Sequence, residues 1–118
     1  MTTTMPDNLI DRGDIVRVDF RPAIGSEQNG EWPALVLTPR AFHELNRKVI
    51  VCPITRNASP WPTNVMLPEG LAVTGAILVD QIRSVDRRHR GFRKIGRVPE
   101  PIVEEVLLIL RELLGWTP

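Results

Sequence analysis

Alternating apolar and polar side chains mark the first element of the chain, at residues 14–20. The side chains divide between two faces: Val16, Val18 and Phe20 on one, and Ile15, Arg17 and Asp19 on the other. A period of two residues is that of a β-strand whose faces meet different surroundings. The pattern therefore predicts a strand here.

Further apolar runs predict the rest of a sheet. They lie at residues 34–37, 48–52, 63–67, 76–85 and 90–98. Most of the 11 prolines stand between these runs, where a missing backbone N–H is tolerated, and Pro53 is expected to end the run before it. The segment 21–32 holds proline, glycine and asparagine and predicts a long loop of the kind that carries function, whereas residues 40–46 suit one irregular helical turn.

Only the C-terminal segment has helical periodicity. Pro99 and Pro101 suit a first turn, and Gly115 suits a stop. Two neighbouring apolar ridges follow: Ile102, Val106, Ile109 and Leu113, and Val103, Leu107, Leu110 and Leu114. A face this broad predicts that the helix covers the sheet, with apolar surface left for a second subunit.

Many short strands and one terminal helix predict a mainly β fold with a C-terminal α-helix. The antiparallel sheet is expected to curve into a barrel, because closure hides the edges of small sheets. At 118 residues the chain is expected to form a single domain over residues 1–118, with residues 1–11 as a flexible N-terminal segment.

Composition narrows the function classes. No run approaches the roughly 20 apolar residues of a membrane span, and the N-terminus lacks the features of a secretory signal, so no membrane association and a cytoplasmic location are expected. One cysteine, Cys52, and two histidines at no ligand-like spacing predict no metal and no cofactor. The net charge is only +1, but seven basic residues and one acid between Arg83 and Arg97 predict a local basic surface.

Five short motifs in a fixed order resemble the frame of MazF/PemK-type toxin ribonucleases. The resemblance covers about residues 12–114, and its motifs are Gly13-Asp14-Ile15-Val16, Gly25-Ser26-Glu27-Gln28, Pro33-Ala34-Leu35-Val36-Leu37, Cys52-Pro53-Ile54-Thr55 and Asp80-Gln81-Ile82-Arg83-Ser84. It implies an SH3-like β-barrel that acts as a homodimer and cleaves single-stranded mRNA at short sequence motifs without a metal. The products would carry 2′,3′-cyclic phosphate and 5′-hydroxyl ends, and the partner would be a MazE-like antitoxin.

The resemblance also implies site residues. Thr55 matches the family's catalytic threonine, and its hydroxyl could donate to a phosphate oxygen. Glu27, in the loop, could help proton transfer. The candidate RNA contacts are Arg21, Gln28, Arg56, Gln81, Arg83 and Arg87. For Thr55 the competing interpretation is a hydroxyl bonded to its own backbone, and for Glu27 and the arginines it is a solvated surface.

Trp32 stands where the family carries the catalytic arginine that faces the phosphate. An indole has one N–H and no charge, whereas a guanidinium is a charged fork of donors. Trp32 could stack on a base or be a packed aromatic. Three explanations of the exchange are open: a loss selected during cloning, an attenuated or inactive homologue, or a neighbouring cation, such as Arg21 or Arg56, in the same role.

Two other functions compete with the ribonuclease. The same barrel occurs in CcdB-type toxins, which bind DNA gyrase and cleave nothing. A regulatory homologue that only binds the antitoxin is the other alternative. The motifs Gly25-Ser26-Glu27-Gln28 and Cys52-Pro53-Ile54-Thr55 favour the ribonuclease branch.

Overall fold

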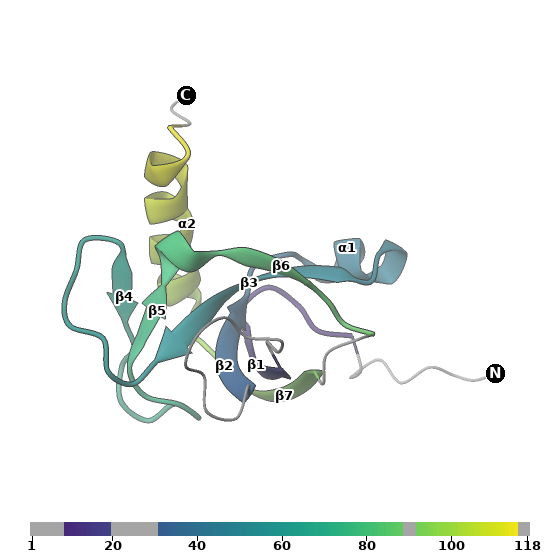
Figure 1. Cartoon of the computed structure of the whole chain (residues 1–118), viewed down its shortest axis with the longest axis horizontal. Helices are drawn as coiled ribbons and strands as arrows, with labels where there is room; N and C mark the ends of the chain where they lie inside the picture. Colours follow the sequence, from purple (N-terminus) through teal and green to yellow (C-terminus); the bar gives the residue numbers. More distant parts are fainter. Residues whose placement is uncertain (1–8, 20–30, 89–91, 116–118) are drawn as a thin grey trace.

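The computed structural model describes residues 9–19, 31–88 and 92–115, and these form an antiparallel sheet with a long C-terminal helix (Figure 1). The strands are β1 (Asp14–Asp19), β2 (Glu31–Val36), β3 (Lys48–Thr55), β4 (Asn64–Met66), β5 (Ala76–Leu78), β6 (Arg83–Asp86) and β7 (Phe92–Arg97). The helices are α1 (Arg40–Leu45), a 3-10 turn η2 (Val79–Gln81) and α2 (Glu100–Leu113). The predicted fold class, mainly β with a C-terminal α-helix, is confirmed.

The sheet is organised around β3. Its strand order is β4-β5-β3-β2-β1-β7, and β6 pairs with β3 outside this path. The first half of β3 pairs with β6, from Lys48 to Val51, and its end pairs with β5 at Ile54 and Thr55. A strand that changes partner along its length turns a corner in the sheet. The end of β3 is therefore held at this corner, with β2 beside it.

Apolar side chains fill both faces of the sheet. The cluster beneath α2 contains Ile15, Leu35, Leu37, Cys52, Ile54, Val65, Ile77, Val79, Val98, Val103 and Val106. The cluster on the other face contains Ile10, Val16, Val18, Ala34, Val36, Val49, Val51 and Val85. The alternation predicted for β1 is thus confirmed for Ile15 against Val16 and Val18, whereas Phe20 lies outside the described residues.

Helix α2 stands beside η2 and β4 (Figure 1). Val103 and Val106 are buried, and both predicted ridges add partly buried residues to the same cluster. The helix ends as predicted, because Gly115 has a φ of 69° and donates its N–H to the Glu112 carbonyl. Leu113 and Leu114, at the ends of the two ridges, are exposed. Helix α2 therefore covers the sheet mainly with its first three turns.

Two predicted boundaries are wrong. The run 76–85 is not one strand, because the 3-10 turn η2 separates β5 from β6. Pro53 does not end β3: it lies opposite Ala34 of β2, and the strand continues to Thr55. Neighbouring pairs, such as Leu35 with Cys52, hold the strand where the proline donates no hydrogen bond.

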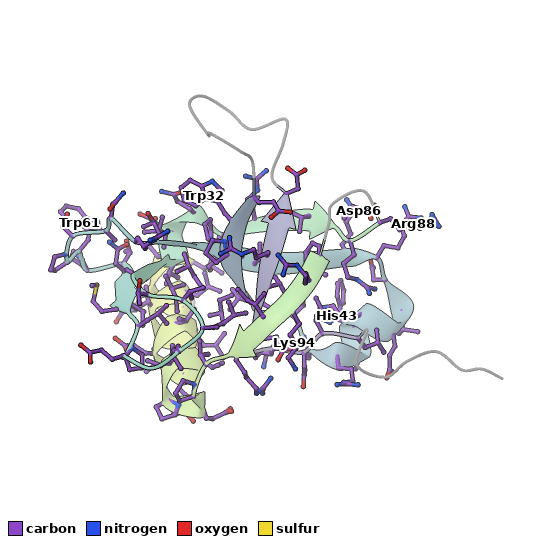
Figure 2. All side chains as sticks on the ribbon, turned by 90° about the horizontal axis from the view of Figure 1, so that it is seen from below. Trp32, His43, Trp61, Asp86, Arg88 and Lys94 are labelled. Atoms are coloured by element: carbon purple, nitrogen blue, oxygen red, sulfur yellow. The ribbon has the colours of Figure 1, made fainter. Side chains whose placement is uncertain are left out.

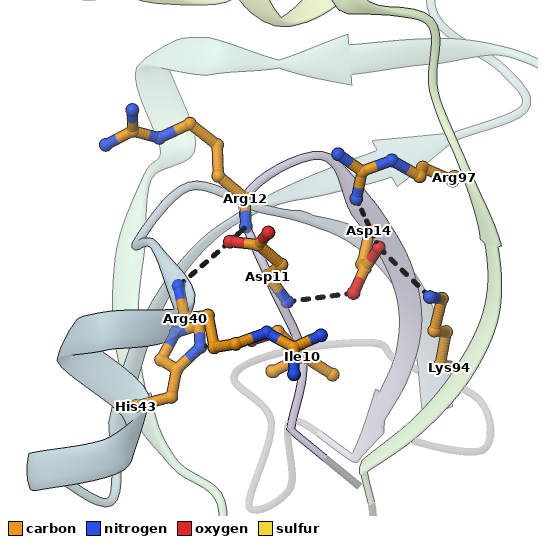
Figure 3. A network of polar contacts seen from close by, with 8 residues as sticks. All are labelled: Ile10, Asp11, Arg12, Asp14, Arg40, His43, Lys94 and Arg97. Carbon is orange, nitrogen blue, oxygen red and sulfur yellow. Dashed lines mark hydrogen bonds and ion pairs between the residues drawn. The ribbon is translucent and has the colours of Figure 1, made fainter. Parts of the chain in front are cut away.

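A buried carboxylate joins β1 to β7 (Figure 3). Asp14 is 1% exposed, and its Oδ1 lies 2.7 Å from Nη1 of Arg97 and 3.4 Å from Nζ of Lys94. Its Oδ2 accepts the backbone N–H of Asp11 at 2.8 Å. The β1–β7 register shifts just after this point, between Ile15 and Val16. Asp14 thus anchors the strand where its pairing changes.

A second set of polar contacts holds α1 against the segment before β1. Oδ1 of Asp11 accepts the backbone N–H of Arg40, the first residue of α1, at 2.9 Å and that of Arg12 at 2.8 Å. Burial raises the pKa of Asp11, but these bonds and the nearby arginine charges outweigh it, and the pKa is lowered.

His43 of α1 is 2% exposed. Its Nδ1 donates to the Ile10 carbonyl at 2.6 Å, and its Nε2 accepts the Thr38 hydroxyl at 2.7 Å. Burial lowers the pKa of His43, and the charge of Arg87 lowers it further, although the bond to Ile10 acts in the opposite direction.

Replacing Asp14 with Asn should destabilise the fold by about 1–3 kcal/mol, because the substitution removes the charge that Arg97 and Lys94 face. Urea denaturation of the two proteins measures this difference. Asp86→Asn is the control, since Asp86 pairs at 3.5 Å with Arg47, whose side chain is 53% exposed, and should cost less than about 1 kcal/mol. Equal losses in the two variants would contradict an anchoring role for Asp14.

Acid should weaken the fold through His43. The pKa of His43 is lower in the folded chain, so as the pH falls the unfolded chain binds a proton first. The contribution of His43 to the free energy of unfolding is therefore complete above about pH 6.5 and is lost as the pH falls below that value. The difference in unfolding free energy between the protein and His43→Gln should therefore shrink from pH 8 to pH 5, by at most about 1.4 kcal/mol per pH unit. Denaturant titrations at each pH test this, and parallel curves would refute it.

Candidate active site

A cavity of about 620 Å³ opens beside three neighbouring strands and two loops. It is lined by Arg17 of β1, by Glu31, Trp32 and Pro33 of β2, by Ile54 and Thr55 of β3, by Arg56 and Asn57, and by Ala72, Val73 and Thr74. The lining thus includes two guanidinium groups, one carboxylate, one indole and the Thr55 hydroxyl. We refer to it below as the cavity.

Thr55 ends β3 at the edge of the cavity. Its Oγ1 accepts the backbone N–H of Asn57 at 3.3 Å, so the local backbone bond that competed with a catalytic role is present. A hydroxyl that accepts one hydrogen bond still has its own proton to donate. The turn therefore orients Oγ1 and leaves its O–H available to a ligand.

Gly75 fixes the position of Thr55. Its φ is +118°, and a Cβ at this residue would lie 2.0 Å from the Thr55 carbonyl oxygen and 2.8 Å from Cα of Arg56. Only glycine accepts both this backbone conformation and this approach. No local sequence pattern indicates this contact, because Gly75 and Thr55 are 20 residues apart and meet only when β5 pairs with β3.

Trp32 has two kinds of neighbours. It is partly buried and packs against the apolar cluster that includes Val16 and Val18, and it also lines the cavity. The β2–β3 pairing, which sets Ala34 opposite Pro53, brings Trp32 level with Thr55. The packed-aromatic interpretation and the base-stacking interpretation are therefore both compatible with its position.

The other predicted RNA contacts separate into three groups. Arg56 is exposed and lines the cavity. Gln81, at the end of η2, and Arg83, in β6, do not line it. Arg21, Gln28 and also Glu27 lie outside the described residues, so their roles stay predictions.

Arg87 is not brought to the cavity. Its Nη2 donates to the carbonyls of His43 at 2.8 Å and Asn46 at 2.7 Å, which fastens the end of α1 to β6. Figure 2 shows the separation, with Trp32 toward the same end of the molecule as Trp61 and His43 toward the other end. The geometry favours a structural role for Arg87 over an RNA contact.

Arg17 is a basic cavity residue that is not among the site residues expected from the sequence. The alternation along β1 placed it on the face of Ile15, but no motif marked it. What could have indicated Arg17 is its place on the strand next to β2, which carries Trp32. In the β1–β2 register Arg17 pairs with Pro33, the residue after Trp32. A cation at that point faces the cavity.

Other reactive groups in the described residues are not arranged for catalysis. Burial raises the pKa of Cys52 to about 12, and the charge of Asp80 adds to the effect, so the thiol stays protonated. Within residues 9–19, 31–88 and 92–115, no group of three or more His, Cys, Asp or Glu side chains could hold a metal ion. In the same ranges no helix is long and apolar enough to span a membrane.

Fold and cavity define a small antiparallel β protein whose cavity is lined by two arginines and the threonine at the end of β3. The family model for the PemK-like, MazF-like toxin of type II toxin-antitoxin systems matches residues 11–114. The chain belongs to this family.

Relatives of known name and structure agree with this assignment. The chain is 36% identical to the endoribonuclease PemK of Escherichia coli over 89% of its length and 82% of PemK, and 39% identical to the endoribonuclease toxin ChpB of Escherichia coli K12 over 88% and 93%. Among solved structures, MazF of Deinococcus radiodurans superposes with a TM-score of 0.83 at 38% identity, over 91% of this chain and 97% of that chain. A MazE–MazF crystal structure from the same organism gives 0.82 at 34% identity, over 92% and 98%.

Replacing Gly75 with Ala should displace the turn at Thr55, because the new Cβ would overlap the Thr55 carbonyl. We expect a loss of about 2–4 kcal/mol in unfolding free energy, or a shift of the Thr55 and Arg56 amide signals in NMR spectra where the backbone yields. Gly70→Ala is the matched control: Gly70 also has a positive φ, +93°, but nothing lies within 4 Å of the added Cβ. If both variants lose the same stability, the close approach has no special role.

Proposed function

We propose that this protein is a toxin endoribonuclease that cleaves single-stranded mRNA at short sequence motifs. One observation carries the proposal: the Thr55 hydroxyl lies in the same cavity as Arg17, Trp32 and Arg56. Guanidinium groups bind phosphates, a hydroxyl can donate to a phosphate oxygen, and an indole can stack on an unpaired base. The names of PemK and ChpB support the same activity.

The proposed reaction is an internal transesterification. The ribose 2′-oxygen attacks the adjacent phosphorus and loses its proton to a base, while the bond from phosphorus to the 5′-oxygen breaks and that oxygen takes a proton. The fragments then carry a 2′,3′-cyclic phosphate and a 5′-hydroxyl. We assign the proton transfers to Glu27, which accepts the 2′-hydroxyl proton and returns it to the leaving 5′-oxygen, and we assign to Thr55 a hydrogen bond to a non-bridging oxygen, where negative charge increases. Side chains supply every group in this scheme, so no metal is needed.

We also propose a homodimer that is neutralised by a MazE-like antitoxin in the cytoplasm. The Deinococcus radiodurans structure at 34% identity is a MazE–MazF complex, which supports a partner of this class. An antitoxin segment with acidic and apolar residues suits a cavity that offers Arg17 and Arg56 beside Trp32. Such a segment would occupy the place of the RNA.

The test is cleavage of a long single-stranded RNA in EDTA, with end-group analysis of the fragments. Thr55→Val keeps the shape of the side chain and removes the hydroxyl, so kcat should fall by about 10²–10³-fold while the fragment ends stay 2′,3′-cyclic phosphate. Thr63→Val is the control, because Thr63 donates to Asp80 at 3.2 Å and does not line the cavity; it should keep its activity.

The proposal fails if neither the protein nor its Trp32→Arg variant cleaves any RNA. Gyrase–DNA complexes trapped by the protein would then support the CcdB-like function instead. Tight antitoxin binding with neither activity would support the regulatory homologue.

A further inference from the structure

We propose that Arg17 supplies the phosphate-facing guanidinium that position 32 lacks, and that Trp32 adds an apolar side chain to the lining of the same cavity. This inference rests on the proposed ribonuclease function. Arg21 and Arg56 are the neighbouring cations that the sequence suggests for this role. The structure adds a cation from β1, the strand next to the one that carries Trp32.

The strand order puts Arg17 and Thr55 on opposite sides of Trp32. β2 lies between β1 and β3 and pairs with both. Arg17 therefore reaches the cavity from the β1 side, across from Pro33, while Thr55 reaches it from the β3 side. A phosphate in the cavity could accept from Arg17 through one non-bridging oxygen and from Thr55 through the other. The in-line displacement needs donors to both oxygens as their charge increases.

The guanidinium of Arg17 is available. Within the described ranges, it has no hydrogen bond or ion pair to another residue, and it is half-buried. Three other basic side chains are already engaged: Arg97 and Lys94 with Asp14, and Arg87 with two carbonyls. An arginine held on a strand without a competing partner is a ready site for a phosphate.

Arg17 is better organised for this role than Arg56. Arg56 follows the end of β3 and is exposed, so binding would have to order its long side chain. Arg17 lies in the middle of β1, with Ile15 packed in the cluster beneath α2. Catalytic groups held by regular elements are positioned more closely than groups on turns. We therefore assign to Arg56 a contact with the rest of the RNA backbone.

Trp32 complements Arg17. Its indole packs against the cluster of Val16 and Val18 and also lines the cavity, so it is both fixed and apolar. An apolar wall excludes water, and a guanidinium attracts a phosphate more strongly where water is scarce. In this arrangement Arg17 of β1 carries the charge that an arginine at position 32 of β2 would carry. Trp32 then provides an apolar surface for the substrate.

The test compares RNA cleavage by the protein, Arg17→Gln, Trp32→Arg, the double variant and Arg93→Gln. Arg17→Gln should lower kcat by about 10²–10³-fold, and adding Trp32→Arg to it should restore activity at least about tenfold. Arg93→Gln is the matched control: it removes the same charge one strand away, opposite Arg17 in the β1–β7 register, from an exposed residue outside the cavity, and should stay within about threefold. Thermal melts establish that all variants fold.

A binding measurement gives a readout independent of turnover. The probe is a single-stranded oligonucleotide with 2′-deoxy sugars, which cannot be cleaved by this reaction. A lost phosphate contact reduces the slope of log K against log salt by about 0.7, so Arg17→Gln should show this reduction and Arg93→Gln should not.

Each alternative result has a distinct meaning. If the protein cleaves RNA and Arg17→Gln cleaves it as fast with an unchanged salt slope, the role of Arg17 is refuted while the ribonuclease function stands. If only Trp32→Arg cleaves, Arg17 does not replace the arginine, and the chain is a ribonuclease disabled at position 32. If no variant cleaves, the proposed function itself fails, and the assignment of Arg17 with it.

Discussion

The buried carboxylate of Asp14 sets the register on which the cavity depends. A charge that is 1% exposed must be compensated, and Arg97, Lys94 and the Asp11 amide do so from fixed positions. The side chains of a strand alternate with a period of two, so a slip of one residue would exchange the faces of β1. Ile15 would then leave the cluster beneath α2, and Arg17 would turn away from the cavity. One ion pair at the start of β1 thus decides where a cation lies three residues later.

The opposite side of the cavity depends on a close backbone contact. β3 changes partner from β6 to β5 near its end, and Gly75 lets the chain pass against the Thr55 carbonyl. The positions of the Thr55 hydroxyl and the Arg17 guanidinium therefore depend on two independent contacts. One is the close approach of Gly75 to the Thr55 carbonyl, and the other is the set of ion pairs of Asp14. Since β2 pairs with both strands, a change at either device would alter the distance across Trp32.

Local patterns predicted the fold class, the phase of β1 and the C-terminal helix, because each depends on the period of apolar residues. The motifs also placed Thr55, Trp32 and Arg56, which the structure brings to one cavity. Other features depend on contacts between residues far apart in the sequence, so local patterns could not predict them. Gly75 matters only once β5 pairs with β3, and Arg17 only once β1 lies beside β2. The carbonyl partners of Arg87, at His43 and Asn46, lie more than 40 residues away, so no local pattern indicates these bonds.

The exchange of arginine for tryptophan at position 32 has a physical logic if Arg17 is the functional cation. Arg17 and Arg56 already bring two guanidinium groups to the cavity, and a third at position 32 would add repulsion in the absence of RNA. With Arg17 present, an apolar residue at position 32 removes that repulsion and adds packing on Val16 and Val18. Phosphate binding requires a positive charge at one position in the cavity, and it does not matter which strand carries the residue that supplies this charge. A family motif can therefore lose its most reactive residue while the cavity retains the charge.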